Sequence, residues 1–151
     1  MGDPAEDEPQ QEPLLEFLAV MRRLQVECPW KAEQTHETLG KYLVEETQEV
    51  LDAIAAGDDD NLCEELGDLL LQVYFHAIYA EQRGAFTIDD VARGITEKMH
   101  RRNPHVFGPD AGKRQLTAAE VDVVWQRIKV EEKAQARPGE PPRGQARPTL
   151  G

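Results

Sequence analysis

The strongest constraint on the fold is the stretch 39–80, which has the pattern of two amphipathic helices joined by an acidic turn at residues 57–61. Helical residues advance by roughly 100° each, so that residues three and four apart share a face. At this spacing the apolar residues are Leu39, Leu43, Val50, Ala53 and Ile54 in the first helix, and Leu62, Leu66, Leu69 and Val73 in the second. The sequence therefore predicts a helical hairpin within an all-α fold.

Four carboxylates lie on or beside these apolar faces. Glu46 falls within the apolar stripe of the first helix, and Glu49 follows one turn later. Glu65 and Asp68 have the same spacing in the second helix and lean toward its apolar side. Because burying unpaired charges is costly and these charges also repel one another, the two pairs need a compensating partner.

A hard divalent cation is the simplest such partner. Mg²⁺ and Mn²⁺ prefer oxygen ligands, and helix bundles bind metals with inward-facing carboxylates. Any one of these acids taken alone is more typical of a solvated helix face, but two pairs at the same spacing favour a metal site. We predict that the ligands of Mg²⁺, with Mn²⁺ as a possible substitute, are Glu46, Glu49, Glu65 and Asp68.

Length and charge narrow the class of protein. A chain of 151 residues is near the usual size of one domain, and its net charge of −12 argues against general binding of nucleic acids or membrane surfaces. No apolar run is long enough to span a bilayer, and the N-terminus is acidic. Cys28 and Cys63 have no metal or redox spacing. We therefore expect a soluble cytoplasmic protein.

The two ends of the chain differ in composition from its middle. Residues 1–13 are acidic with three prolines, and residues 134–151 are rich in Pro, Gly and Arg. Both compositions predict disordered tails around one domain at 14–133. Beyond the hairpin, apolar periodicity and turn or cap residues predict helices at 14–26, 87–99 and 117–133, with the second hairpin helix at 62–83.

A basic segment stands out in this acidic chain. Lys98 and Arg102 are four residues apart on one helix face, and so are Trp125 and Lys129 in the last predicted helix. A basic run is usually a solvated face, and Trp125 could equally be a core residue beside an exposed lysine. If the ligand is a triphosphate, however, cations must offset the repulsion between the metal-binding carboxylates and the phosphates.

Several motifs together resemble a known family. Glu45-Glu46-Thr47-Gln48-Glu49 followed by Glu65-Leu66-Gly67-Asp68 is similar to the EExxE…ExxD signature of the MazG nucleoside triphosphate pyrophosphohydrolases. Further landmarks occur in the family's order, namely Cys28-Pro29-Trp30, Gln34-Thr35-His36, the segment 101–107 and Trp125-x-x-x-Lys129. The resemblance covers about residues 14–133.

The resemblance implies an all-α, four-helix-bundle-like fold and an Mg²⁺-dependent activity. Members hydrolyse nucleoside triphosphates, ribo- or deoxyribo-, to the monophosphate and pyrophosphate, which suggests housecleaning of the nucleotide pool. It assigns Lys98 and Arg102 to the phosphates, Trp125 and Lys129 to the nucleotide, and Trp30 with His36 to the edge of the site. Glu45 lies next to the predicted ligands but is rotated off the stripe, which makes it a candidate second-metal ligand or general base.

The second hairpin helix predicts a dimer. Its segment LLLQVYFHAIYA is apolar nearly all round, and a chain of this length offers few elements to cover it. We therefore expect a second copy of the chain to do so, in agreement with the dimers or higher assemblies of the family. His76, within this segment, is interpreted as a core histidine and not as a metal ligand.

Two other functions remain open. A di-iron or di-manganese bundle also uses inward glutamates but needs two Glu-x-x-His motifs in its core, and the motif Glu33-x-x-His36 lies at a helix entrance. A non-catalytic helical dimer that binds a nucleotide or a partner as a regulator is the other alternative. Lys31 also departs from the family, because relatives often carry an acid there. The chain has one pyrophosphohydrolase domain, whereas some members of the family have two in tandem. The choice of nucleotide therefore stays open.

Overall fold

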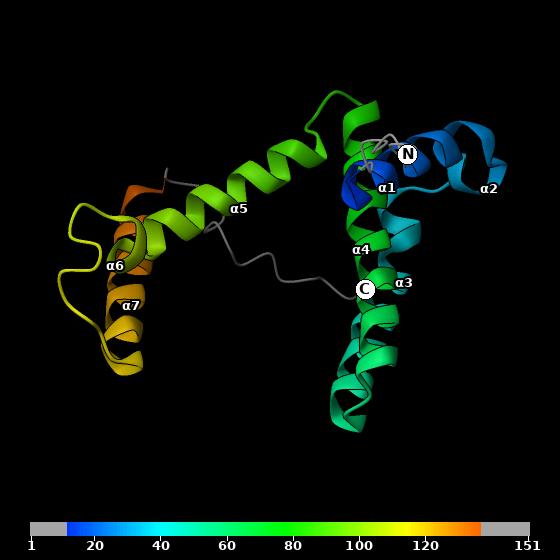
Figure 1. Cartoon of the computed structure of the whole chain (residues 1–151). Coiled ribbons are helices and arrows are strands. Elements are labelled where there is room, and N and C mark those ends of the chain that lie inside the picture. Colours follow the sequence, from blue (N-terminus) through cyan, green and yellow to red (C-terminus); the bar gives the residue numbers. More distant parts are fainter. Residues whose placement is uncertain (1–11, 137–151) are drawn as a thin grey trace, which may run out of the picture. The chain divides into compact units, whose positions relative to one another are not determined.

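The computed structural model describes residues 12–136, which contain α-helices and no strand (Figure 1). The helices are α1 (Pro13–Glu27), α2 (Pro29–Ala32), α3 (His36–Ala56), α4 (Asp59–Gln82), α5 (Ile88–Arg102), α6 (Pro104–Phe107) and α7 (Ala118–Gln135). The prediction of an all-α fold is confirmed. Helices α1 and α7 extend one and two residues beyond the predicted domain 14–133, and the remainder of the predicted tails, 1–11 and 137–151, lies outside the described residues.

The hairpin of α3 and α4 is closed by local backbone chemistry. Thr35 and Thr38 form a capping box at the start of α3. Gly57 ends that helix with a φ of 67°, a conformation that glycine adopts without steric cost. The Asp58 side chain then accepts a hydrogen bond from the backbone N–H of Asn61, so α4 begins at Asp59 and not at Leu62. The turn is therefore shorter than the predicted 57–61.

The other helix ends follow the same rules. Thr87 and Asp90 bond reciprocally to each other's backbone N–H groups, and Thr117 accepts a hydrogen bond from the N–H of Glu120. Helix α5 continues three residues past the predicted end at Met99. Cys28 is extended and ends α1 as predicted, but Pro29 then starts the short helix α2, because proline suits the first position of a helix.

The chain divides into two units within α5, residues 1–91 and 92–151. In the described part of the first unit, α3 packs along α4, and α1 packs against α4 and α2. The Tyr79 hydroxyl donates a hydrogen bond to the Lys31 carbonyl, which ties α2 to α4. The buried core is formed by Leu18, Met21, Leu39, Tyr74, Phe75, Ile78 and Tyr79.

The predicted apolar stripe is only partly buried. Leu39, Val50 and Ala53 are buried as expected, but four other members are exposed, namely Leu43, Ile54, Leu66 and Val73. The reason is that α1 contributes to the core beside residues 74–79, so that the first half of α4 has α3 as its neighbour. The sequence predicts that a second copy covers the apolar segment 69–80, but Tyr74, Phe75, Ile78 and Tyr79 of that segment are already buried within this chain. The dimer itself stays a prediction.

In the second unit, long side chains connect α5 to α7. Arg101 and Arg102 each form an ion pair with Glu132, and the Trp125 indole N–H donates to the side chain of Asn103. The ring of His100 also contacts that of Phe107 in α6. None of the helices in residues 12–136 is long and apolar enough to cross a membrane.

Truncation of Leu39 tests the core of the first unit. Leu39 is 1% exposed, so Leu39→Ala should lower the free energy of unfolding by about 2–5 kcal/mol through lost burial and a residual cavity. Val26→Ala, at a side chain that is 81% exposed in α1, serves as the control and should change it by about 0.5 kcal/mol or less. Urea unfolding measures both. Equal effects would contradict this assignment of the core.

Candidate metal centre

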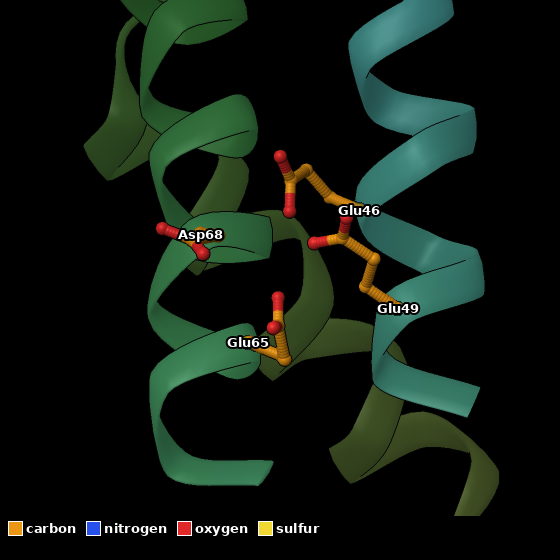
Figure 2. A group of neighbouring side chains, drawn as sticks. All are labelled: Glu46, Glu49, Glu65 and Asp68. Carbon is orange, nitrogen blue, oxygen red and sulfur yellow. The ribbon is translucent and has the colours of Figure 1, made fainter. Parts of the chain in front are cut away.

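The structure brings the four predicted metal ligands together. Glu46 and Glu49 extend from α3 toward Glu65 and Asp68 on α4, as Figure 2 shows. One oxygen atom of each carboxylate can be chosen such that all four lie within 4.8 Å of one another. The i, i+3 spacing on each helix produces this convergence, because it places both acids of a pair on the side that faces the neighbouring helix.

Two of these carboxylates are only partly satisfied. The Oε2 atoms of Glu46 and Glu65 are buried and have no hydrogen-bond partner among the described residues. A buried acceptor without a partner keeps its full desolvation cost, and that cost is higher when the atom is charged. The cluster is therefore electrostatically unfavourable in the isolated chain.

Burial and repulsion between the carboxylates also change their pKa values. Hydrogen bonding to Glu49, then burial and the charges of Glu49, Asp68 and Glu46, raise the pKa of Glu65 to about 7. Burial, followed by the charges of Glu49 and Asp68, also raises the pKa of Glu46 above its ordinary value. Both carboxyl groups therefore hold a proton more readily than an isolated glutamate does, and a nearby positive charge would oppose this shift.

The residues present fit a divalent cation. They provide oxygen atoms alone, which suits Mg²⁺ or Mn²⁺, and the two unpartnered oxygens could be satisfied by a metal ion. The set contains no histidine, although a di-iron or di-manganese bundle of the Glu-x-x-His type requires it. The identity of the ion stays a prediction, as does that of the ligands.

Glu45 is separate from this group. Its side chain is exposed, and its charge contributes to the raised pKa of Glu46. Among the described residues that could hold a metal ion together, Glu45 is not included. A role as a second ligand or as a base therefore remains a hypothesis.

The candidate residues near the start of α3, Trp30 and His36, each contact other side chains of the first unit. The Trp30 ring meets Tyr42 edge-on, with ring centres 6.1 Å apart, and the ammonium group of Lys31 lies 5.5 Å from the Trp30 ring centre. This packing neither confirms nor contradicts a nucleotide-binding role for Trp30. Sequence reasoning gave no indication of one contact here, between His36 and His76. Their Nδ1 atoms are 2.7 Å apart, whereas the Nε2 atom of His76 is buried and has no hydrogen-bond partner within residues 12–136.

The predicted phosphate- and nucleotide-binding residues belong to the second unit, so their place beside the carboxylates stays a prediction. Lys98 is partly buried and Lys129 is exposed. Arg102 donates to Glu132, and Trp125 donates to Asn103. Glu132 was not singled out from the sequence, and Asn103 occurred in the landmark segment 101–107 without a role of its own, because contacts across 30 and 22 residues leave no periodic signal.

Comparison with known proteins gives a consistent result. Residues 34–107 match the family model for the MazG nucleotide pyrophosphohydrolase domain. The chain is 45% identical over 124 residues to the Thermotoga maritima protein named nucleoside triphosphate pyrophosphohydrolase/pyrophosphatase MazG, covering 81% of this chain and 46% of that protein. It is 46% identical over 122 residues to the nucleoside triphosphate pyrophosphohydrolase of Escherichia coli K12, covering 79% and 45% respectively.

A solved structure agrees with these matches. The crystal structure of a mazG-related protein from Thermotoga maritima has a TM-score of 0.66 to this chain, with 27% sequence identity over 77% of this chain and 98% of that one. The chain spans about half the length of the two curated relatives described above.

The raised pKa of Glu65 predicts an unusual pH dependence. An acid with a higher pKa in the folded state than its ordinary 4.5 destabilises the fold as the pH rises from about 4.5 to 7. In EDTA, Glu65→Gln should therefore raise the Tm at pH 8 relative to wild type and have a smaller effect at pH 5. Differential scanning fluorimetry measures both.

Glu64→Gln is the matched control, because Glu64 is an exposed neighbour outside the group. Addition of Mg²⁺ at pH 8 should raise the Tm of wild type and of Glu64→Gln, and should raise that of Glu65→Gln much less. A concentration 100 times Kd corresponds to about 2.7 kcal/mol of stabilisation. An equal Mg²⁺ response in all three proteins would contradict the assignment of Glu65.

Proposed function

Because the chain belongs to the MazG nucleotide pyrophosphohydrolase family, we propose that it hydrolyses nucleoside triphosphates, ribo- or deoxyribo-, to the monophosphate and pyrophosphate. The single observation that carries this proposal is the convergence of four carboxylates from α3 and α4, two of them with a buried unpartnered oxygen. The two curated relatives described above are named for this activity. The setting that we propose is housecleaning of the cytoplasmic nucleotide pool.

Glu46, Glu49, Glu65 and Asp68 would hold the metal ion, for which Mg²⁺ is the first candidate. When bound, such an ion neutralises charge on the phosphate oxygens and favours ionisation of an attacking water. Glu45, exposed on the same helix and next to Glu46, is our candidate for the group that accepts a proton from water or holds a second ion.

The cationic residues of α5 are assigned to the phosphates. In a chain with a net charge of −12, a triphosphate is repelled unless local positive charge offsets that field. Lys98 and Arg102 supply two such charges one helical turn apart, and a guanidinium group binds phosphate oxygens with directed hydrogen bonds.

The α7 residues are assigned to the nucleoside and the adjoining phosphate. Trp125 offers an aromatic face for base stacking, and its indole N–H is already bonded to Asn103, which fixes the orientation of the ring. Lys129 follows one turn later with an exposed ammonium group.

A second copy of the chain is part of the proposal. Leu66 and Val73 of α4 are 48% and 41% exposed, together with Leu43 and Ile54 of α3. Exposed apolar side chains on two adjacent helices favour burial against a partner surface. A homodimer would bury them and complete the four-helix arrangement.

The first test is a turnover panel over ribo- and deoxyribonucleoside triphosphates with and without Mg²⁺. Wild type should release monophosphate and pyrophosphate, separated by ion-exchange chromatography, and EDTA should stop the reaction. Glu46→Gln and Asp68→Asn should each lower kcat by about 100-fold or more, because each removes a ligand charge from the ion.

Glu64→Gln again serves as the control and should keep the activity of wild type. Release of diphosphate and orthophosphate would replace the proposed reaction by a different phosphoryl transfer. Binding of Mg²⁺ without turnover of any nucleotide would instead support the regulator alternative.

Trp125→Ala tests the nucleoside assignment. Base stacking on an aromatic side chain contributes about 1–3 kcal/mol, so KM should rise by about 5- to 150-fold while pyrophosphate remains the product. Trp125→Phe keeps an aromatic face and should recover most of the loss. A KM of Trp125→Ala equal to that of wild type would assign Trp125 a purely structural role.

A further inference from the structure

One carboxylate connects the two arginines at the end of α5 to α7. Arg101 Nε donates to Glu132 Oε1 at 2.8 Å, and Arg102 Nη2 donates to Glu132 Oε2 at 3.0 Å. The side chains of Arg102 and Glu132 are 19% and 21% exposed, whereas that of Arg101 is 51% exposed. The pair formed by Arg102 and Glu132 is therefore the more shielded of the two and is less screened by solvent.

The charges of this cluster do not cancel. Hydrogen bonds from Arg102 and then Arg101 lower the pKa of Glu132 to about 2, so the carboxylate is ionised at neutral pH. Two guanidinium groups and one carboxylate leave one net positive charge. The cluster can thus hold Arg102 in place and still attract an anion.

Arg102 also retains hydrogen-bonding capacity. A guanidinium group has five N–H donors, and the bond to Glu132 uses one nitrogen of Arg102. Its Nε atom is buried and has no partner among the described residues. Because the Nε atom is buried, a phosphate oxygen would bind the terminal N–H groups of this side chain, which is 19% exposed.

The neighbouring contact of α7 fixes a second side chain of the proposed site. Asn103 follows Arg102 in the chain, and its amide donates to the Met99 carbonyl while its Oδ1 atom accepts from Trp125. Trp125 and Glu132 are seven residues apart, which is two turns of α7 and therefore the same face. The bonds of Asn103 and Glu132 thus set the position of Arg102 relative to Trp125.

From this arrangement we infer that Glu132 is a positioning residue, which holds the Arg102 guanidinium group where it binds the phosphates of the substrate. The inference rests on the proposed function, in that it takes Arg102 as a phosphate ligand. An arginine that is already ordered loses less conformational freedom when the triphosphate binds, so removal of the carboxylate weakens phosphate binding without removing a reacting group.

The test measures binding and turnover separately. Titration calorimetry with inorganic tripolyphosphate in Mg²⁺ reports the phosphate contacts alone, because this probe has no base. Glu132→Gln should raise its Kd by about tenfold. In the turnover assay the same variant should raise KM by a similar factor with kcat close to that of wild type.

Glu131→Gln is the matched control, since Glu131 is the adjacent residue and pairs at 3.9 Å with the exposed Arg127. It removes the same charge from the same turn and should leave both constants unchanged. A general loss of structure in Glu132→Gln would lower the active fraction, and hence kcat per total protein and the calorimetric stoichiometry, without raising KM or Kd.

A double-mutant cycle decides whether Glu132 acts through Arg102. In an Arg102→Gln background, Glu132→Gln should add little to the Kd for tripolyphosphate. Equal effects in both backgrounds would overturn the inference, as would a Kd that is unchanged or lower in the single variant. The inference would also be overturned if the wild-type protein did not bind tripolyphosphate. Binding that behaves as expected in a protein without turnover would instead contradict the proposed function alone.

Discussion

Mutual repulsion among four carboxylates is the constraint on which the site depends. The hairpin of α3 and α4 holds Glu46, Glu49, Glu65 and Asp68 within 4.8 Å, where like charges raise the pKa of Glu46 and of Glu65. Packing of the two helices, in which Leu39 and Ala53 are 1% exposed, must outweigh this repulsion. The hairpin therefore has an unfavourable charge arrangement that a divalent cation would relieve, which would link metal binding to stability.

In the second unit the repelling charges are positive, and a carboxylate of opposite charge lies between them. These cations are close together at the end of α5, and Glu132 offsets part of that charge while keeping Arg102 ordered. In the same way, Asn103 orients the Trp125 ring by accepting a hydrogen bond from its indole N–H. A site for a triphosphate needs both features, namely acids that hold a cation and fixed N–H groups that donate to phosphate oxygens.

Much of the fold could be predicted from local sequence. Period-3.6 patterning and the cap residues Thr35, Gly57, Thr87 and Thr117 place the helices within a few residues, because caps act through hydrogen bonds to the adjacent turn. The prediction that the apolar stripe is buried was wrong at Leu43, Ile54, Leu66 and Val73, which are exposed. Periodicity shows that a face is apolar but does not show which neighbour covers it, and α1 packs in the core with residues 74–79 of α4.

The sequence by itself determined the helices and the identity and spacing of the acids, because i, i+3 geometry fixes which side chains share a helix face. Only the tertiary structure decided that the two acid pairs meet, that Glu132 engages Arg101 and Arg102, and that His36 contacts His76. These contacts join residues up to 40 positions apart. Their geometry depends on how whole helices pack, which no local pattern encodes.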